Sequence, residues 1–161
     1  MDVIINTHDA ITETGQDYPW MIFSHDGTEY CINSKYVLTV EILGEIIPMM
    51  DTDSHCIGLV HSRDSMIELL DLRSLYGCGN KLPAESDALN NCNLMVVIEV
   101  DGKRLGVIAD QIVAVERITR FETGVISRAN GNSTLTYISR VAKREKSNKP
   151  LFVIYPEHLC A

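Results

Sequence analysis

Short apolar runs recur along the chain, and turn-forming residues separate them at regular intervals. The run "YVLTVEIL" (36–43) is rich in β-branched residues and alternates in the manner of a strand with one buried face. No segment places apolar residues at the 3.6-residue spacing of a long amphipathic helix. Short strands separated by turns, without a long helix, predict an all-β barrel or sandwich.

Two Asp-Gly pairs mark the expected hairpins. They lie at residues 26–27 and 101–102, each between two apolar runs. Both residue types tolerate positive φ, so each pair predicts a two-residue β-turn. The polar stretch 78–93 divides the chain near its middle, and one hairpin opens each half. We therefore expect two similar β-barrels.

The first eighteen residues differ from the rest of the chain. They contain four acidic residues and no lysine or arginine, and the ordered pattern begins only at Trp20. We predict a flexible tail over residues 1–18 and a folded domain over residues 19–161. A chain of 161 residues suits one domain, or two small subdomains that share a core.

The formal net charge is −8 at pH 7. This charge argues against a protein that binds a phosphate backbone, so no nucleic-acid partner is expected. Residues 140–149, "RVAKREKSNK", are nevertheless locally basic. Two interpretations of this patch remain open: an anion-binding site, or the solvated tip of a hairpin.

The five cysteines show no C-x-x-C spacing, and the N-terminus lacks the pattern of a signal peptide. No segment approaches the roughly 18 uninterrupted apolar residues that a membrane span requires. These features predict a cytoplasmic protein with reduced, mostly buried thiols and no direct membrane insertion.

The tetrapeptide His61-Ser62-Arg63-Asp64 contains the residue types of a hydrolytic triad. Neighbouring residues of a strand point to opposite faces, however, so these side chains cannot converge on one substrate. The serine also lacks a G-x-S-x-G elbow, and "YGCGN" (76–80) lacks the lysine-serine pair of a phosphate loop. We expect no catalytic residue and no cofactor.

A metal site is the remaining chemical possibility. His55, Cys56 and His61 are close in sequence, and Cys31 or Cys78 could join them in space. The interval from His55 to His61 misses the H-x₃₋₅-H spacing of structural zinc sites. No metal is predicted, and a small β-barrel metal protein or enzyme using His61 and the nearby cysteines stays as the alternative from another class.

The region around Arg63 carries a more specific pattern. Gly58 and Arg63 precede "ELLDLRSLYG" (68–77), in which Asp-Leu-Arg follows an apolar strand. This order resembles the central motif of the bacterial chemotaxis coupling proteins, the CheW family. That family has a Gly-Val-x-Asn-Leu-Arg-Gly turn, an apolar strand and an Asp-Leu-Arg. His61 and Ser62 replace the family's Asn-Leu, and Asp64 replaces its second glycine.

The resemblance covers residues 20–160. The segment 96–118 resembles the second-half hairpin of the family, and the segment 137–159 resembles its last strand pair and terminal helix. This likeness implies two five-stranded β-barrel subdomains that share an apolar core, with short helical turns.

The same resemblance implies a function. A CheW-like protein is a non-catalytic adaptor of bacterial chemosensory signal transduction, located in the cytoplasm at membrane-associated chemoreceptor arrays. It bridges the cytoplasmic tip of a chemoreceptor and the regulatory domain of a CheA-type histidine kinase. Other CheW-like domains are further candidate partners. The alternative within this fold is a divergent paralogue with altered partners in another chemosensory or motility system.

The resemblance also assigns candidate residues. Val37, Gly58 and Arg63 are expected to bind the receptor, and Asp71 and Arg73 to hold a structural turn. Two alternatives stay open at this point. Arg63 could be a structural arginine paired with Asp64 or Asp71, and Val37 could be part of the core.

Overall fold

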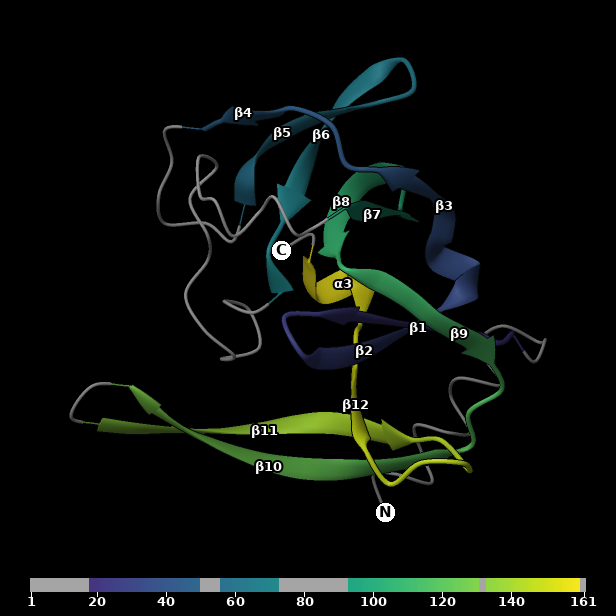
Figure 1. The fold of residues 1–161 in the computed structure, drawn as a ribbon, viewed down its shortest axis with the longest axis vertical. Helices are drawn as coiled ribbons and strands as arrows, with labels where there is room; N and C mark the ends of the chain where they lie inside the picture. Colours follow the sequence, from purple (N-terminus) through teal and green to yellow (C-terminus); the bar gives the residue numbers. More distant parts are fainter. Residues whose placement is uncertain (1–17, 50–55, 73–92, 131–132, 160–161) are drawn as a thin grey trace. The chain divides into compact units, whose positions relative to one another are not determined.

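The computed structural model describes residues 18–49, 56–72, 93–130 and 133–159, and it consists mainly of β-strands (Figure 1). The helical elements with described bounds are short: the 3-10 helix η1 (Ser34–Tyr36) and the helix α3 (Pro156–Leu159). The predicted all-β class with short helical turns is confirmed. The predicted tail lies outside the described residues except for Tyr18.

The twelve described strands form two sheets of six. The first sheet has the order β10 (Arg120–Asn130), β11 (Ser133–Lys143), β12 (Pro150–Val153), β2 (Thr28–Asn33), β1 (Trp20–His25) and β9 (Gln111–Glu116). The second has the order β3 (Val37–Ile42), β7 (Leu94–Val100), β8 (Lys103–Ala109), β6 (Ser65–Leu70), β5 (Cys56–Ser62) and β4 (Ile46–Pro48). Both sheets are mixed, because β12 runs parallel to β2 and β6 runs parallel to β8.

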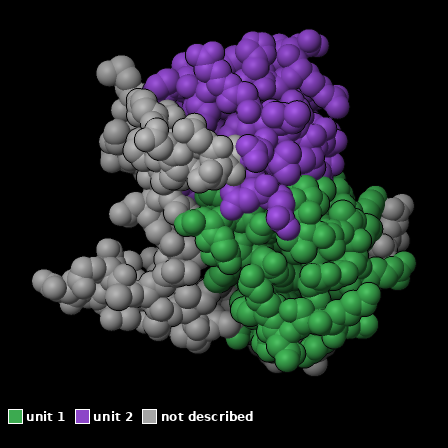
Figure 2. Space-filling view, in the orientation of Figure 1, with its two compact units in different colours: residues 1–35, 112–155 green, residues 36–111, 156–161 purple. Residues whose placement is uncertain are grey.

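The chain divides into two compact units, which Figure 2 shows in different colours. Unit 1 comprises residues 1–35 and 112–155 and holds the first sheet, and unit 2 comprises residues 36–111 and 156–161 and holds the second. Each sheet has six strands, whereas the resemblance implied five in each barrel. The difference has a simple origin: β4 has only three residues, and β9 follows β8 after Asp110 alone. The three residues of β4 leave no separate pattern in the sequence.

Both Asp-Gly hairpins form as predicted. Asp26 and Gly27 join β1 to β2 with φ values of 52° and 78°, and Asp101 and Gly102 join β7 to β8 with φ values of 51° and 81°. Positive φ at both central residues is the requirement that selects Asp-Gly for such turns. Here local sequence determines the turn directly.

Each unit has its own apolar cluster. In unit 1, Trp20 packs against Phe121 with ring centroids 5.3 Å apart, and Tyr30 is fully buried between Phe23 and Phe152. The cluster of unit 2 is aliphatic and consists of Ile57, Val60, Ile67, Leu69, Met95, Val97 and Ile108. These residues come from β5, β6, β7 and β8, so the four central strands of the second sheet are fixed by one core. A core shared by both units stays a prediction.

Candidate functional site

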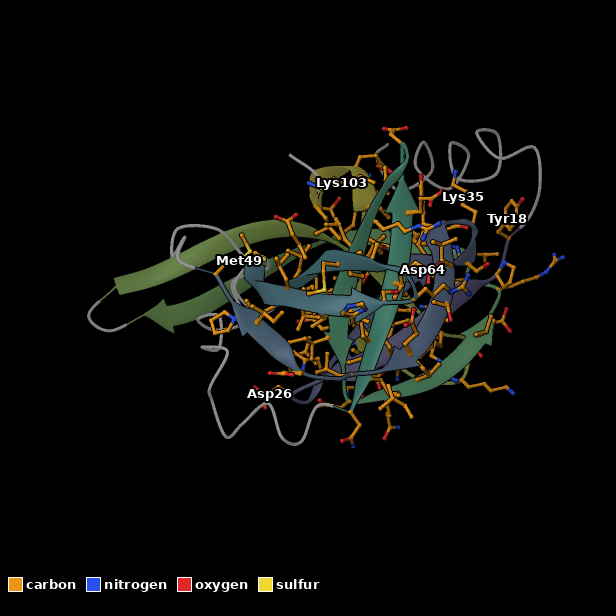
Figure 3. The ribbon with its side chains drawn as sticks, turned by 90° about the horizontal axis from the view of Figure 1, so that it is seen from above. Tyr18, Asp26, Lys35, Met49, Asp64 and Lys103 are labelled. Atoms are coloured by element: carbon orange, nitrogen blue, oxygen red, sulfur yellow. The ribbon has the colours of Figure 1, made fainter. Side chains whose placement is uncertain are left out.

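The predicted turn at Arg63 is present in unit 2. Strands β5 and β6 pair down to Ser62 and Ser65, so Arg63 and Asp64 form a two-residue connection. Figure 3 labels Asp64, the second residue of this turn. The four side chains of the tetrapeptide do not converge: Ser62 is buried, whereas His61, Arg63 and Asp64 are exposed. The structure therefore agrees with the rejection of a triad.

The backbone of Arg63 is unusual. Its φ is 55°, close to the values of Asp26 and Asp101 at the same position of the other two hairpins. Asp tolerates this conformation because its short side chain hydrogen-bonds locally, but for other L-residues it costs roughly 1–2 kcal/mol. Arg63 thus occupies a position where local sequence preference favours Asp, Asn or Gly. Such a conformation persists only where the surrounding structure holds it.

The guanidinium of Arg63 is exposed and forms no ion pair or hydrogen bond with any residue in the described part of the chain. The alternative in which Arg63 pairs with Asp64 is therefore not observed. Pairing with Asp71 is excluded by geometry: Asp71 follows the far end of β6, and six strand residues span about 20 Å. The charge of Arg63 is available to a partner.

Ser62 is tied to a distant strand. Its Oγ donates a hydrogen bond to Oε2 of Glu41 on β3, with 2.8 Å between the oxygens. This contact was not predicted, because nothing near Ser62 in the sequence indicates Glu41, which lies 21 residues earlier. The only available signal was a single carboxylate within the otherwise apolar run of 36–43.

Gly58 lies in the middle of β5, between Pro48 of β4 and Leu69 of β6. It is buried, and a Cβ at this position would lie 2.3 Å from the carbonyl oxygen of Ile47 and 2.9 Å from Cγ2 of Ile46. Only glycine therefore allows β4 to pair this closely with β5. Within the described structure, Gly58 supports the hairpin that carries Arg63.

Val37 is the first residue of β3 and pairs with Ile98 of β7. It is half-buried, and the register of β3 shifts between Val37 and Thr39. The neighbouring Leu38 is 44% exposed, and Ile42 at the end of the strand is 84% exposed. β3 thus presents apolar side chains to solvent at both ends, as a binding strand would.

Asp71 is completely buried and directly follows β6. A buried carboxylate must be held by partners, which is consistent with the structural role predicted for it. Arg73, its predicted companion, lies outside the described residues.

The metal alternative gains no support. Within the described residues, no three histidine, cysteine, aspartate or glutamate side chains are placed to hold a metal ion. Cys56 is buried, and its Sγ donates to the carbonyl oxygen of Gly58 at 3.2 Å. Burial also raises the pKa of the Cys31 thiol well above its usual range, which disfavours the thiolate that binds metals. His55 and Cys78 lie outside the described residues.

Three of the five cations of the basic stretch 140–149 are paired with acids of unit 1. The side chain of Arg144 makes two hydrogen bonds to Glu116 of β9, and this contact raises the pKa of the guanidinium. Lys143 lies 3.0 Å from Glu122, and Lys149 lies 3.7 Å from Glu29. Acids of β9, β10 and β2 thus neutralise these three charges, which argues against the anion-binding interpretation.

Two β-sheet units with an arginine presented on a hairpin turn define a small all-β binding module. The family comparison gives this class a name: residues 19–160 match the family model of the CheW-like domain. The chain therefore belongs to the CheW-like domain family, a family of scaffold and adaptor proteins of chemotaxis that act through protein–protein interaction. The pattern around Arg63 had predicted this membership.

A solved structure supports the same fold. The chain is similar to the scaffolding protein TtCheW from Thermoanaerobacter tengcongensis, with a TM-score of 0.61 and 19% sequence identity. The alignment covers 87% of this chain and 90% of that chain. No curated protein matches the sequence. No helix of the described residues has the length and apolarity that crossing a bilayer demands.

Proposed function

We propose that this protein is a non-catalytic adaptor that links the cytoplasmic tip of a chemoreceptor to the regulatory domain of a CheA-type histidine kinase. Membership of the CheW-like family and the likeness to a scaffolding protein support this proposal. The adaptor acts in the cytoplasm at chemoreceptor arrays, where other CheW-like domains are further partners. Its receptor-binding residues are Val37, Gly58 and Arg63, with Gly58 acting through the shape of the hairpin.

The observation that carries the proposal is the state of Arg63. The guanidinium of Arg63 is exposed and has no partner among the described residues, and it stands on a two-residue turn with positive φ. A guanidinium presents a rigid fork of donors that matches carboxylates in bidentate geometry. The two-residue turn holds the backbone of Arg63, so the backbone loses little entropy when a carboxylate of the receptor helices binds.

The first prediction concerns Arg63→Ala. This change should weaken binding of a receptor-tip fragment by about 1–3 kcal/mol, the range for a hydrogen bond to a charged group, because the partner carboxylate loses its donors. Binding of the kinase regulatory domain should stay within twofold of the unchanged protein. Isothermal titration calorimetry with each partner measures both affinities.

The matched control is Arg104→Ala. Arg104 is also an exposed arginine of unit 2 beside a hairpin turn, but it is paired with Glu99 at 3.0 Å. Its removal should leave receptor binding unchanged. If Arg63→Ala lowers the affinity for both partners equally and also lowers the Tm, Arg63 has a structural role instead.

A second candidate is an adaptor of the same fold with different partners. His61 and Asp64 are exposed beside Arg63 and differ from the family motif, so the surface around the arginine departs from that motif. A pull-down of the organism's own receptors and kinases separates the two candidates. Capture of a receptor and a CheA-type kinase supports the first, and capture of neither supports the second.

A further inference from the structure

The hydrogen bond between Ser62 and Glu41 joins strands that are not neighbours. In the second sheet, β7, β8 and β6 lie between β3 and β5. The oxygens of the two side chains are nevertheless 2.8 Å apart. The sheet must therefore curl until the end of β5 meets β3. The contact links β3 and β5 at the end where the Arg63 turn begins.

Ser62 is held at two points. Its hydroxyl donates to Glu41, and its carbonyl oxygen accepts a hydrogen bond of 3.5 Å from Oγ of Ser65. Only 4% of Ser62 is exposed, so water cannot replace these bonds easily. A buried hydroxyl that loses its hydrogen-bond partner costs free energy. The hydrogen bond to Glu41 therefore fixes the position of the Ser62 side chain.

The residue that follows this anchor is Arg63, whose φ of 55° is unfavourable for arginine. A strained turn persists only when the surrounding structure over-determines it. The two hydrogen bonds of Ser62 supply that constraint on one side of the turn. Neither Arg63 nor Glu41 forms an ion pair within the described ranges. The carboxylate of Glu41 thus accepts the hydrogen bond of Ser62 and is not paired with Arg63.

We propose that Ser62 and Glu41 are positioning residues, whose hydrogen bond holds the Arg63 turn in the orientation that a receptor carboxylate requires; this inference rests on the function proposed above. The pair acts through Arg63 and does not itself touch the partner. The hydroxyl of Ser62 and a hydrogen-bond acceptor at position 41 are the required groups. A negative charge at position 41 is not required.

The experiment uses the full chain with Ser62→Ala, Glu41→Ala and Glu41→Gln. Loss of the hydrogen bond should raise the receptor-tip Kd by about three- to tenfold in the two alanine variants, the effect of one intramolecular hydrogen bond. Glu41→Gln keeps an acceptor oxygen and should bind within twofold of the unchanged protein. Hydrogen exchange at the amides of Arg63 and Asp64 should accelerate in the alanine variants alone. Kinase-domain affinity should not change.

The decisive measurement is the double variant Ser62→Ala with Arg63→Ala. If Ser62 acts through Arg63, the double variant binds the receptor no more weakly than Arg63→Ala alone, because position is irrelevant once the guanidinium is gone. If the increases in receptor Kd of the two single variants multiply in the double variant, Ser62 acts independently of Arg63 and the proposal is wrong. The double variant Ser62→Ala with Glu41→Ala should likewise match either single variant.

Failure of this inference differs from failure of the proposed function. If Arg63→Ala weakens receptor binding but Ser62→Ala changes neither binding nor turn exchange, the positioning role is wrong and the adaptor function stands. If Arg63→Ala leaves receptor binding intact, the receptor role of Arg63 is wrong, and the positioning role falls with it. If Ser62→Ala lowers the Tm strongly, the receptor Kd and turn exchange of Glu41→Ala test the positioning role, because Glu41 is only half-buried.

Discussion

At the scale of single residues, Arg63 and Asp26 show how one backbone conformation serves two purposes. Both open a two-residue hairpin with φ above 50°. Asp26 is the residue type that the turn prefers, so its identity follows from local structure. Arg63 is not, and at the same place it exposes a charge that no residue of the described ranges pairs with. This conflict between local preference and observed residue supports the proposal that Arg63 binds a partner.

A second prediction follows for Arg63→Gly. Glycine adopts positive φ without steric cost, so the free energy of unfolding should rise by about 0.5–1 kcal/mol although the receptor affinity falls. Urea denaturation measures the first effect and calorimetry the second. Asp64→Gly is the matched control: Asp64 has no positive φ in the described structure, so glycine there should lower stability slightly. A lower stability for Arg63→Gly would show that the arginine side chain stabilises the fold.

At the scale of the element, the β5–β6 hairpin is shaped by its neighbours on both sides. β4 pairs closely with β5 at Gly58, and β3 reaches the end of β5 through Glu41. The inner faces of β5 and β6 contribute Ile57, Val60, Ile67 and Leu69 to the apolar cluster of unit 2. The turn is thus carried by a rigid hairpin and not by an isolated loop.

A third prediction tests this packing with Gly58→Ala. The new Cβ would meet the backbone oxygen of Ile47 at 2.3 Å, which cannot move without displacing β4. Forcing an extra methyl into such a site should destabilise the protein by about 1–3 kcal/mol, measured as a lower urea midpoint. Gly44→Ala is the control, since a Cβ there meets nothing within 4 Å. Equal stability of the two variants would contradict the close approach of β4.

At the scale of the whole molecule, the two six-stranded sheets differ in the groups that they carry. Unit 2 contains Val37, Gly58 and Arg63, the proposed receptor residues. Unit 1 contains the aromatic core and the ion pairs that neutralise Lys143, Arg144 and Lys149. Cys31 is a fully buried titratable group of unit 1 and belongs to its apolar cluster.

A fourth prediction concerns alkaline pH. Burial holds the pKa of Cys31 far above the value of about 8.5 expected in the unfolded chain. The unfolded chain therefore loses this proton first, so the related stability is fully present below about pH 8.5 and declines as the pH rises above it. Between pH 7.5 and 10 the unchanged protein should lose about 2 kcal/mol more than Cys31→Ala. Parallel declines in urea titrations of both proteins would contradict this prediction.

What the sequence determined by itself was local or periodic. The alternation of strands, the Asp-Gly turns and the motif around Arg63 each depend on a few adjacent residues, so they predicted the all-β class, both hairpins and the family. The short strand β4 escaped prediction because three residues are too few to show a period.

Only the tertiary structure decided which distant groups meet. The hydrogen bond from Ser62 to Glu41, the close approach of Ile47 to Gly58 and the pairing of Arg144 with Glu116 all join separate strands. Such contacts depend on strand order, register and the curl of each sheet. Residues adjacent in sequence do not determine any of these features. The sequence thus predicted an arginine on a turn, whereas only the fold showed that the residue before it is hydrogen-bonded to β3.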